Sequence, residues 1–293
     1  MPELPEVEVL VRHLRPLVCN QTIRQVEVRR ARVISPTSLK QFKRTLVGAK
    51  ILELERRGKY LLFQLQPLRG RNPLRLVGHL GMTGRMFVAP QGAPLPKHAA
   101  VVLSIGRERF IYEDTRYFGR LTLETSAIAK LGPEPLGKDF IREGFAAALK
   151  RSRQAIKIKL LDQALVAGVG NIYASEALFR ARISPRLAAC RLTLAQVGHL
   201  RRAIREVLAD AIQRGSTIPL SFAGASQDGL FYFGQLPGTP DFYAERLRVY
   251  DRAGEACVRC KSPIKRIVQA ARSTFYCPQC QGAATQRRAS RRR

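Results

Sequence analysis

Apolar and polar residues alternate over much of the first 125 residues, in short runs that are broken by Gly, Pro or charged turns. These runs have the length and period of β-strands. They lie at 23–28 (IRQVEV), 51–55 (ILELE), 59–65 (KYLLFQL), 74–80 (LRLVGHL), 99–105 (AAVVLSI), 108–112 (ERFIY) and 119–123 (GRLTL). A helix is expected before them from Pro5 to Arg15, because Val7, Leu10 and Leu14 share one stripe and proline suits a first helical turn. The pattern predicts a β-sandwich or barrel-like domain with a flanking helix.

The pattern becomes helical after a turn-rich segment, LGPEPLGKDF, which marks a boundary near Leu136. Helical periods are expected at 144–152, 156–165, 172–183 and 194–215. Residues 216–242 are Gly-rich and too long to be a simple connection. We therefore predict an α+β chain. Its expected parts are an N-terminal β-sandwich domain over 2–136, a helical domain over 137–250, a cysteine module over 251–284 and a disordered basic tail over 285–293.

The charge balance is strongly basic, with 51 Lys and Arg against 22 Asp and Glu, a net charge of +29 and a pI near 11.0. Such an excess favours a polyanionic partner, and nucleic acid is the usual one; a solvated basic face or a membrane-surface binder are the alternatives. No apolar run approaches the ~18 residues of a membrane span, and the acidic start is unlike a secretory signal. We expect a cytoplasmic protein with reduced thiols.

Four cysteines near the end of the chain have metal-ligand spacing: C-x2-C, sixteen residues, then C-x2-C. They are Cys257, Cys260, Cys277 and Cys280. Each C-x2-C offers two sulfurs to one point, so the spacing predicts a single Zn²⁺, structural because four sulfurs leave no open position; two disulfides are the alternative. The residues between the pairs are expected to form a β-hairpin whose cations face a phosphate backbone. Cys19 and Cys190 have no partner pattern.

The chain begins MPELPEVEVL, which places three glutamates within a few residues of Pro2. Removal of Met1 would leave Pro2 as a free secondary amine, and an α-amino group has a pKa of ~7.7–8, so much of it is nucleophilic at neutral pH. Such an amine can attack a sugar C1′, displace a base and leave an iminium. Glu3 adjoins the amine as a candidate acid, and Glu6 lies one helical turn further on. The alternative is that Glu3, Glu6 and Glu8 only complement the helix dipole.

Several long motifs, in order, resemble those of the bacterial formamidopyrimidine-DNA glycosylases. They are PELPEVE, GKYLL, GHLGMTGR, DTRYFGR, LGPEPL, DQALVAGVGNIYASEALF and RSTFYCPQC. The resemblance implies a base-excision repair enzyme of the bacterial cytoplasm and nucleoid, monomeric and bound to double-stranded DNA. It would remove oxidised purines such as 8-oxoguanine and formamidopyrimidines and then cut the strand by β,δ-elimination. The implied fold is an N-terminal β-sandwich with flanking helices, a helix-two-turns-helix domain and a zinc-finger hairpin, with DNA in the cleft between the halves.

The resemblance also implies roles for single residues. Pro2 matches the nucleophile, Glu3 the acid that protonates the deoxyribose ring oxygen, Glu6 a supporting carboxylate and Lys59 a lysine near the lesion. Without the family, Lys59 would be a solvated cation at a strand start.

Three further residues match the trio that fills the gap left by an everted nucleotide: Met82, Arg116 and Phe118. A thioether and an aromatic ring can wedge and stack there, and a guanidinium can hydrogen-bond the orphaned base. Core packing is the alternative for Met82 and Phe118, although the glycines around Met82 indicate a loop tip. The remaining matches are contacts to DNA phosphates: His79, Lys157, Asn171 and Arg272.

Two alternatives to this function stay open. One is the sister group typified by endonuclease VIII, which prefers oxidised pyrimidines; the PELPEVE start argues against it. The other is a DNA-binding relative without catalysis. Residues 216–242 correspond to the loop that closes over the everted base in this family, and they are longer than usual. This departure bears directly on the expected preference for 8-oxoguanine.

Overall fold

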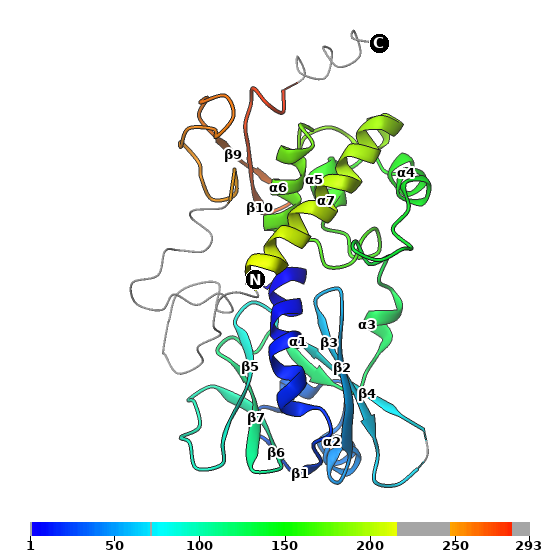
Figure 1. Ribbon diagram of the computed structural model, residues 1–293, viewed down its shortest axis with the longest axis vertical. Coiled ribbons are helices and arrows are strands. Elements are labelled where there is room, and N and C mark those ends of the chain that lie inside the picture. Colours follow the sequence, from blue (N-terminus) through cyan, green and yellow to red (C-terminus); the bar gives the residue numbers. More distant parts are fainter. Residues whose placement is uncertain (1, 71, 216–246, 283–293) are drawn as a thin grey trace. The chain divides into compact units, whose positions relative to one another are not determined.

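The computed structural model describes residues 2–70, 72–215 and 247–282, which form two compact units. The first unit contains the described residues up to Lys130 and also Gly215, and the second contains 131–214 and 247–282. Figure 1 traces the first unit in blue to green and the second in green to red. The predicted α+β class, with a strand-rich N-terminal part, a helical part and a cysteine hairpin, is confirmed.

Two four-stranded antiparallel sheets make up the first unit. One has the order β1-β6-β7-β5, formed by β1 (Ile23–Val28), β6 (Ala99–Ile105), β7 (Glu108–Asp114) and β5 (Gly84–Pro90). The other has the order β2-β3-β4-β8, formed by β2 (Lys50–Arg57), β3 (Tyr60–Gln66), β4 (Leu74–His79) and β8 (Arg120–Thr122). The chain therefore crosses from the second sheet to the first between β4 and β5, and returns between β7 and β8.

The core of the first unit lies between these sheets and under the N-terminal helix. Phe63 on β3 meets Phe110 on β7 edge to face, with ring centroids 5.4 Å apart, so the two sheets face each other. The apolar stripe of helix α1 (Leu4–Val18) joins the same cluster, and Leu10 and Leu14 are fully buried. Burial of this stripe fixes the helix across the sandwich (Figure 1).

Among the elements that the sequence pattern did not predict, β5 and α2 have clear physical reasons for being missed. Strand β5 was missed because its apolar run is short and lies between Gly84 and Pro90. Helix α2 (Leu39–Leu46) was missed because only Phe42 and Leu46 are buried. It is capped by Ser38, whose hydroxyl accepts the Gln41 N–H at 3.2 Å.

The second unit is helical, with a two-stranded hairpin. Its larger elements are α4 (Arg142–Lys150), α5 (Ile156–Lys159), α6 (Asn171–Arg180), α7 (Leu194–Gly215), β9 (Lys265–Gln269) and β10 (Arg272–Tyr276). Short elements complete the secondary structure of the described residues: η1 (Ala31–Ile34) and α3 (Ser126–Ala129) in the first unit and η2 (Ala189–Arg191) in the second. The helix expected over 156–165 ends at Lys159, because the Asp162 carboxylate accepts the Ala164 N–H at 2.9 Å and turns the chain.

Helix α1 is also tied to the turn between β2 and β3. Arg56, on β2, donates to Glu8 on α1 at 2.8 Å and to the Gly58 carbonyl at 3.1 Å. The second carboxylate oxygen of Glu8 accepts from Arg12 at 2.8 Å. The Arg56 side chain is 10% exposed and that of Arg12 is 52% exposed. Burial raises the pKa of Glu8, but hydrogen bonds from Arg56 and Arg12 outweigh it and hold the pKa below its usual value.

We predict that Arg56→Ala destabilises the first unit by about 1–3 kcal/mol, because it leaves Glu8 and a carbonyl without a largely buried donor. Arg12→Ala is the matched control. It removes the other partner of the same carboxylate from an exposed position, where such a pair contributes about 0.2–1 kcal/mol. Urea denaturation of both variants is the measurement, and equal losses of stability would contradict the prediction.

Candidate active site and nucleic-acid interface

The acidic start of the chain is buried. Pro2 directly precedes Glu3, the N-cap of α1, and Glu3 and Glu6 are each 1% exposed. The Glu6 carboxylate accepts the backbone N–H of Glu3 at 2.8 Å, one side of a capping box. Burying a carboxylate costs desolvation energy, which complementing a helix dipole does not require. The capping box orders Glu3 directly after residue 2.

Lys59 and His79 lie together in the first unit. Lys59 follows Gly58, which has φ +57, in the two-residue turn between β2 and β3, and it is 7% exposed. Tyr60 pairs with His79 across β3 and β4, with ring centroids 4.8 Å apart. Lys59 is therefore a buried cation and not the solvated one that its local sequence indicates.

His79 is neutral. Burial, then the positive charges of Lys59 and Arg120, lower its pKa to about 4. Its Nδ1 accepts the Gly81 N–H at 3.1 Å, which assigns the remaining ring proton to Nε2. A neutral imidazole can donate one hydrogen bond to a phosphate oxygen from Nε2, and it adds no charge to the site.

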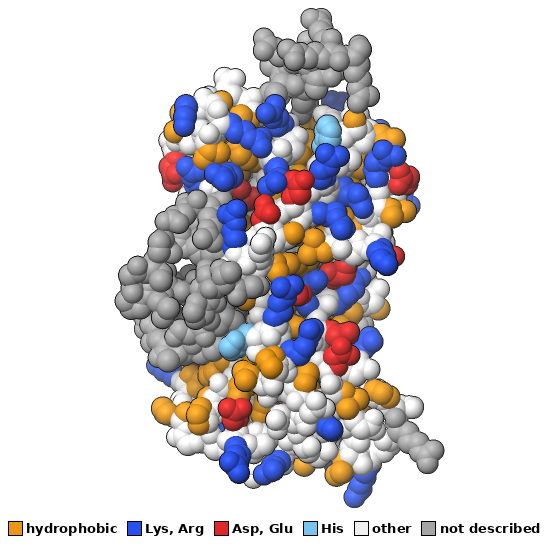
Figure 2. All heavy atoms as spheres, in the orientation of Figure 1, with side chains coloured by type: hydrophobic (Ala, Val, Ile, Leu, Met, Phe, Trp, Pro, Cys, Tyr) orange, Lys and Arg blue, Asp and Glu red, His pale blue; other side chains and the backbone are white. Residues whose placement is uncertain are grey.

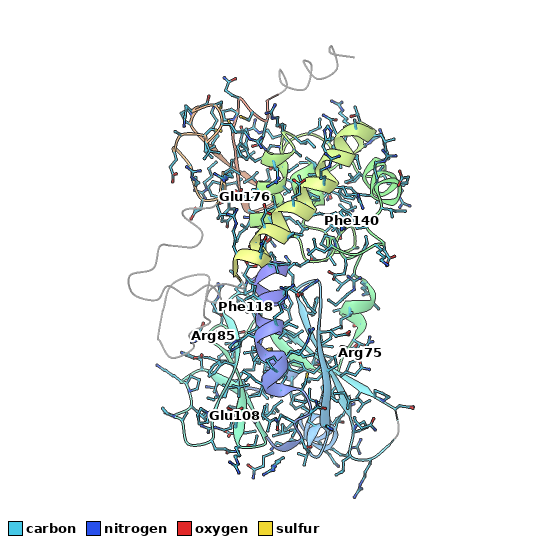
Figure 3. All side chains as sticks on the ribbon, in the orientation of Figure 1. Arg75, Arg85, Glu108, Phe118, Phe140 and Glu176 are labelled. Atoms are coloured by element: carbon cyan, nitrogen blue, oxygen red, sulfur yellow. The ribbon has the colours of Figure 1, made fainter. Side chains whose placement is uncertain are left out.

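Met82, Arg116 and Phe118 are brought together, although 34 residues separate the first two. Arg116 donates to the Met82 sulfur at 3.5 Å, and its guanidinium lies 4.7 Å from the centroid of the Phe118 ring. Met82 is 47% exposed and Phe118 is 46% exposed, so neither is a core residue. Figure 3 labels Phe118 on the segment that joins β7 to β8. The alternative of core packing is excluded for this pair.

In the second unit, Lys157 and Asn171 form a hydrogen-bonded pair. Lys157 is completely buried, and its ammonium donates to Asn171 Oδ1 at 2.5 Å. Because an ammonium only donates, it fixes the orientation of the amide, and Asn171 Nδ2 donates to the Ser273 carbonyl at 3.0 Å. The predicted phosphate contact of Lys157 stays a prediction. Its burial favours a role through Asn171, the first residue of α6, where the helix dipole favours an anion.

Arg272 begins β10 and is exposed. Its neighbour Ser273 accepts from Asn171 through its carbonyl and from Arg266 through its hydroxyl, at 3.0 Å each. The hairpin is thus attached to the start of α6, and Arg272 stands beside that attachment with its side chain in solvent.

The four cysteine sulfurs converge on one point, all within 4.8 Å of one another. The pairs Cys257–Cys280 and Cys260–Cys277 are 3.9 and 3.4 Å apart, close to the ~3.8 Å between sulfurs around tetrahedral zinc. Hydrogen bonds from Ser262 lower the pKa of Cys260 to about 6. The donor set therefore fits zinc and holds it without an open position.

Burial and the neighbouring thiols raise the pKa values of Cys277 and Cys280, and burial is the larger cause. Several thiolates at this spacing repel one another unless a cation lies between them. Zinc supplies that charge when bound, and it joins the two ends of the β9–β10 hairpin.

Two residues that sequence reasoning missed hold the second unit together. Glu176 is 5% exposed, and its carboxylate accepts the backbone N–H groups of Arg248, Val249 and Tyr250, all at 2.9 Å. Gln281 is 1% exposed and bridges the Cys277 N–H to the Ile183 carbonyl, at 2.9 Å each. Glu176 lies inside the mostly apolar run NIYASEALF, and a charged residue in such a run is the only sequence feature that could have indicated its role. Figure 3 labels Glu176.

Basic side chains are widely spread over the surface. Figure 2 shows Lys and Arg on many parts of the visible face and few Asp or Glu between them, as expected from a net charge of +29. This field attracts nucleic acid without regard to sequence. Among the described helices, none combines the length and apolarity that crossing a membrane requires. The predicted closing loop at 216–242 and the basic tail at 285–293 lie outside the described residues.

We predict that acid destabilises the protein through His79. A histidine in the unfolded chain has a pKa near 6.5, whereas the pKa of folded His79 is lowered to about 4. The unfolded state therefore holds more protons in this window. The contribution of His79 to stability is complete above pH 6.5 and is lost toward pH 4, at about 1.4 kcal/mol per pH unit.

His79→Gln removes this term and isolates it from the other acids. Urea unfolding at pH 7.0, 5.5 and 4.5 is the measurement, and the difference in stability between wild type and variant should shift in the variant's favour as pH falls. Parallel curves, or an NMR titration of the His79 ring near pH 6.5, would refute the assignment.

We also predict that metal loss disrupts the hairpin and weakens DNA binding at least tenfold, because the binding energy of a structural zinc is folding energy. Cys260→Ser should lower the zinc content and the affinity for duplex DNA. Cys190→Ser is the control, since Cys190 lies outside the cluster. DNA binding that persists after metal loss has been verified would contradict this role.

Three family models match consecutive parts of the chain. They describe the formamidopyrimidine-DNA glycosylase N-terminal domain at residues 1–121, the H2TH domain of the same enzymes at 131–221, and the zinc finger found in FPG and IleRS at 254–282. The last match agrees with the four-cysteine zinc-binding cluster.

Relatives cover nearly the whole length. The formamidopyrimidine-DNA glycosylase of Thermus thermophilus is 43% identical over 289 residues, 96% of this chain and 99% of the relative. That of Carboxydothermus hydrogenoformans is 39% identical over 282 residues, 96% and 100% of the two chains.

Solved structures of these glycosylases have the same fold as this chain. The Lactococcus lactis enzyme with DNA containing N7-benzyl-Fapy-dG superposes with a TM-score of 0.82 at 34% identity, covering 96% of this chain and all of that one. A complex of the same enzyme with abasic-site DNA also has a TM-score of 0.82, at 34% identity, covering 96% of this chain and 99% of that one. From its two sheets to its cysteine hairpin, this chain belongs to the formamidopyrimidine-DNA glycosylase family.

Proposed function

We propose that this protein is a bifunctional DNA glycosylase and AP lyase that removes oxidised purines, 8-oxoguanine and formamidopyrimidines, and then cuts the strand. The observation that carries the proposal is the buried start of α1. There the amine position of Pro2 is followed at once by Glu3, 1% exposed and bonded through its N–H to Glu6 at 2.8 Å. Family membership supplies the substrate class, since the Lactococcus lactis enzyme was crystallised with Fapy-dG DNA and with abasic-site DNA.

The chemistry begins with the secondary amine of Pro2 after removal of Met1. Its lone pair attacks C1′ and forms a C1′–N bond, while the bond from C1′ to the purine breaks; the proton that the amine loses passes to the departing base, which leaves neutral. Glu3 gives its proton to the ring oxygen, so the sugar opens to an iminium. Glu6 holds the geometry through its bond to the Glu3 N–H.

The iminium then acidifies the C2′ proton. Loss of that proton breaks the C3′–O bond, and a second proton loss breaks the C5′–O bond, which is β,δ-elimination. Hydrolysis of the iminium releases Pro2. Lys59, a buried cation beside His79, offers its charge near the DNA backbone and the lesion.

Base removal requires that the nucleotide first leave the stack, at a cost of a few kcal/mol. Met82, Arg116 and Phe118 fill the space that it leaves. They are exposed, and Arg116 already contacts both Met82 and Phe118 without DNA, so little ordering is required of them on binding. His79, Asn171 and Arg272 contact phosphates, and Lys157 acts with Asn171.

The parts of the chain divide this work. Residues 2–136 carry the chemistry, 137–250 form the helix-two-turns-helix DNA-binding part with the lesion-closing loop, and 251–284 form the zinc finger. The protein acts as a monomer on the bacterial chromosome in the cytoplasm, and the strong positive charge supports that location.

Borohydride trapping on duplexes tests the nucleophile. Wild type should form a covalent adduct with an abasic-site duplex and with 8-oxoguanine opposite cytosine, and mass spectrometry should locate it at Pro2. A protein with an N-terminal extension should fold and form none. A C-terminal extension of equal length is the control and should leave trapping intact. An adduct located on a lysine would overturn the mechanism.

The same assay separates the alternatives. Excision of an oxidised pyrimidine in preference to 8-oxoguanine would indicate the endonuclease VIII-like alternative, and binding without any adduct would indicate a non-catalytic relative. Glu3→Gln should slow base removal more than cleavage of a preformed abasic site. Glu8→Gln, a carboxylate on the same helix, should slow neither by more than about twofold.

A further inference from the structure

Two segments of the first unit run between its sheets in opposite directions. Residues 80–83 leave β4 and lead to β5, and residues 115–119 leave β7 and return to β8. Met82 lies on the first segment, and Arg116 and Phe118 lie on the second. The three proposed gap-filling residues therefore depend on two stretches of chain that are far apart in sequence.

Both segments bond to one carboxylate. Asp114, the last residue of β7, is completely buried. Its Oδ1 accepts from the Thr83 hydroxyl at 2.6 Å and from the Arg116 N–H at 3.1 Å. Its Oδ2 accepts from the Gly119 N–H at 2.9 Å and from the Tyr112 hydroxyl at 3.4 Å. Four donors satisfy the buried acid, and three of them come from the two crossing segments.

The backbones of the two segments also touch. Gly81 has φ +61, and a Cβ on it would lie 2.5 Å from the Gly119 nitrogen and 2.8 Å from the Phe118 carbonyl carbon. A Cβ on Gly119 would collide with the Tyr112 hydroxyl and the His79 carbonyl oxygen. Neither segment has room to slide past the other, so Asp114 and the two glycines join them into one rigid piece.

We propose that Asp114 is a positioning residue that couples the Met82 segment to the Arg116–Phe118 segment, and thereby sets recognition of the base opposite the lesion; this rests on the proposed function. Asp114 reaches Arg116 through the backbone, while the Arg116 guanidinium contacts Met82 at 3.5 Å. Thr83 is the one side chain in this set of bonds that ties the Met82 segment to the acid. Its loss should displace the wedge without removing any group that touches DNA.

Thr83→Val is therefore the sharpest test. It keeps the size and branching of the side chain and removes only the donor to Asp114. Thr122→Val is the matched control, because Thr122 is 6% exposed and its hydroxyl bonds to Thr37 at 2.9 Å in the same unit. Asp114→Asn is the stronger variant, because an amide nitrogen cannot accept from Gly119 or Arg116.

Single-turnover rates should be measured on 8-oxoguanine opposite cytosine and opposite adenine, and on a single strand with a preformed abasic site, which needs no gap filling. Thr83→Val should slow excision opposite cytosine about tenfold and change the ratio of the rates opposite cytosine and opposite adenine. Cleavage of the abasic single strand should stay within about twofold of wild type, and Thr122→Val should match wild type throughout.

Unchanged excision and unchanged preference in Thr83→Val would overturn the proposal. So would equal losses on all three substrates, which would mean general loss of folded enzyme; thermal melting of both Thr→Val variants identifies that outcome. Wild type in the same panel tests the proposed function separately. If wild type does not excise 8-oxoguanine opposite either base, the proposed function fails and the coupling proposal fails with it. If wild type is active and Thr83→Val is unaffected, only the coupling proposal is refuted.

Discussion

The chemistry proposed for this protein depends on holding the first residues of a chain still. Chain ends normally fray because few contacts offset the entropy lost on ordering them. Here α1 buries an apolar stripe that includes Leu10 and Leu14, and its first turn is closed by the bond from the Glu3 N–H to Glu6 at 2.8 Å. Residue 2 is therefore attached to a helix that is itself part of the core. A nucleophile at residue 2 is thus held as firmly as a side chain in the interior of the sequence. A nucleophile held in the reacting geometry lowers the entropy cost of the reaction.

The electrostatics follow from the same burial. A protein of net charge +29 attracts DNA over its whole surface, which favours association but does not select a lesion. Selective chemistry also requires carboxylates at fixed positions within this positive field. Glu3, Glu6 and Asp114 are such carboxylates, and each is at most 1% exposed. His79 makes the complementary adjustment: with its pKa lowered to about 4, it adds no further cation next to Lys59. Strong long-range attraction and a locally balanced site are thus compatible in one chain.

Sequence reasoning predicted most of this arrangement where the signal is local. Strand alternation, the stripe of α1 and the cysteine spacing each depend on short-range periodicity, and the structure contains the sandwich, the helix and the converging sulfurs. It did not predict the burial of Lys157 or the three backbone N–H groups gathered by Glu176, because those partners are 14 and more than 70 residues away. The motif around Asp114 was recognised for Arg116 and Phe118, yet the aspartate's own role depends on Thr83, 31 residues earlier.

If Met82, Arg116 and Phe118 fill the gap as proposed, their position on crossing segments has a physical advantage over a position on a free loop. A loop that orders only on DNA uses binding energy to offset its own entropy, and a base leaves the stack only at a cost of a few kcal/mol. Segments 80–83 and 115–119 are anchored at both ends by strands of opposite sheets, and their backbones approach so closely that Gly81 and Gly119 admit no side chain. Their order is therefore supplied by folding of the sandwich. The binding energy of DNA remains available for distorting DNA, and the stability of the two sheets becomes part of how the lesion is reached.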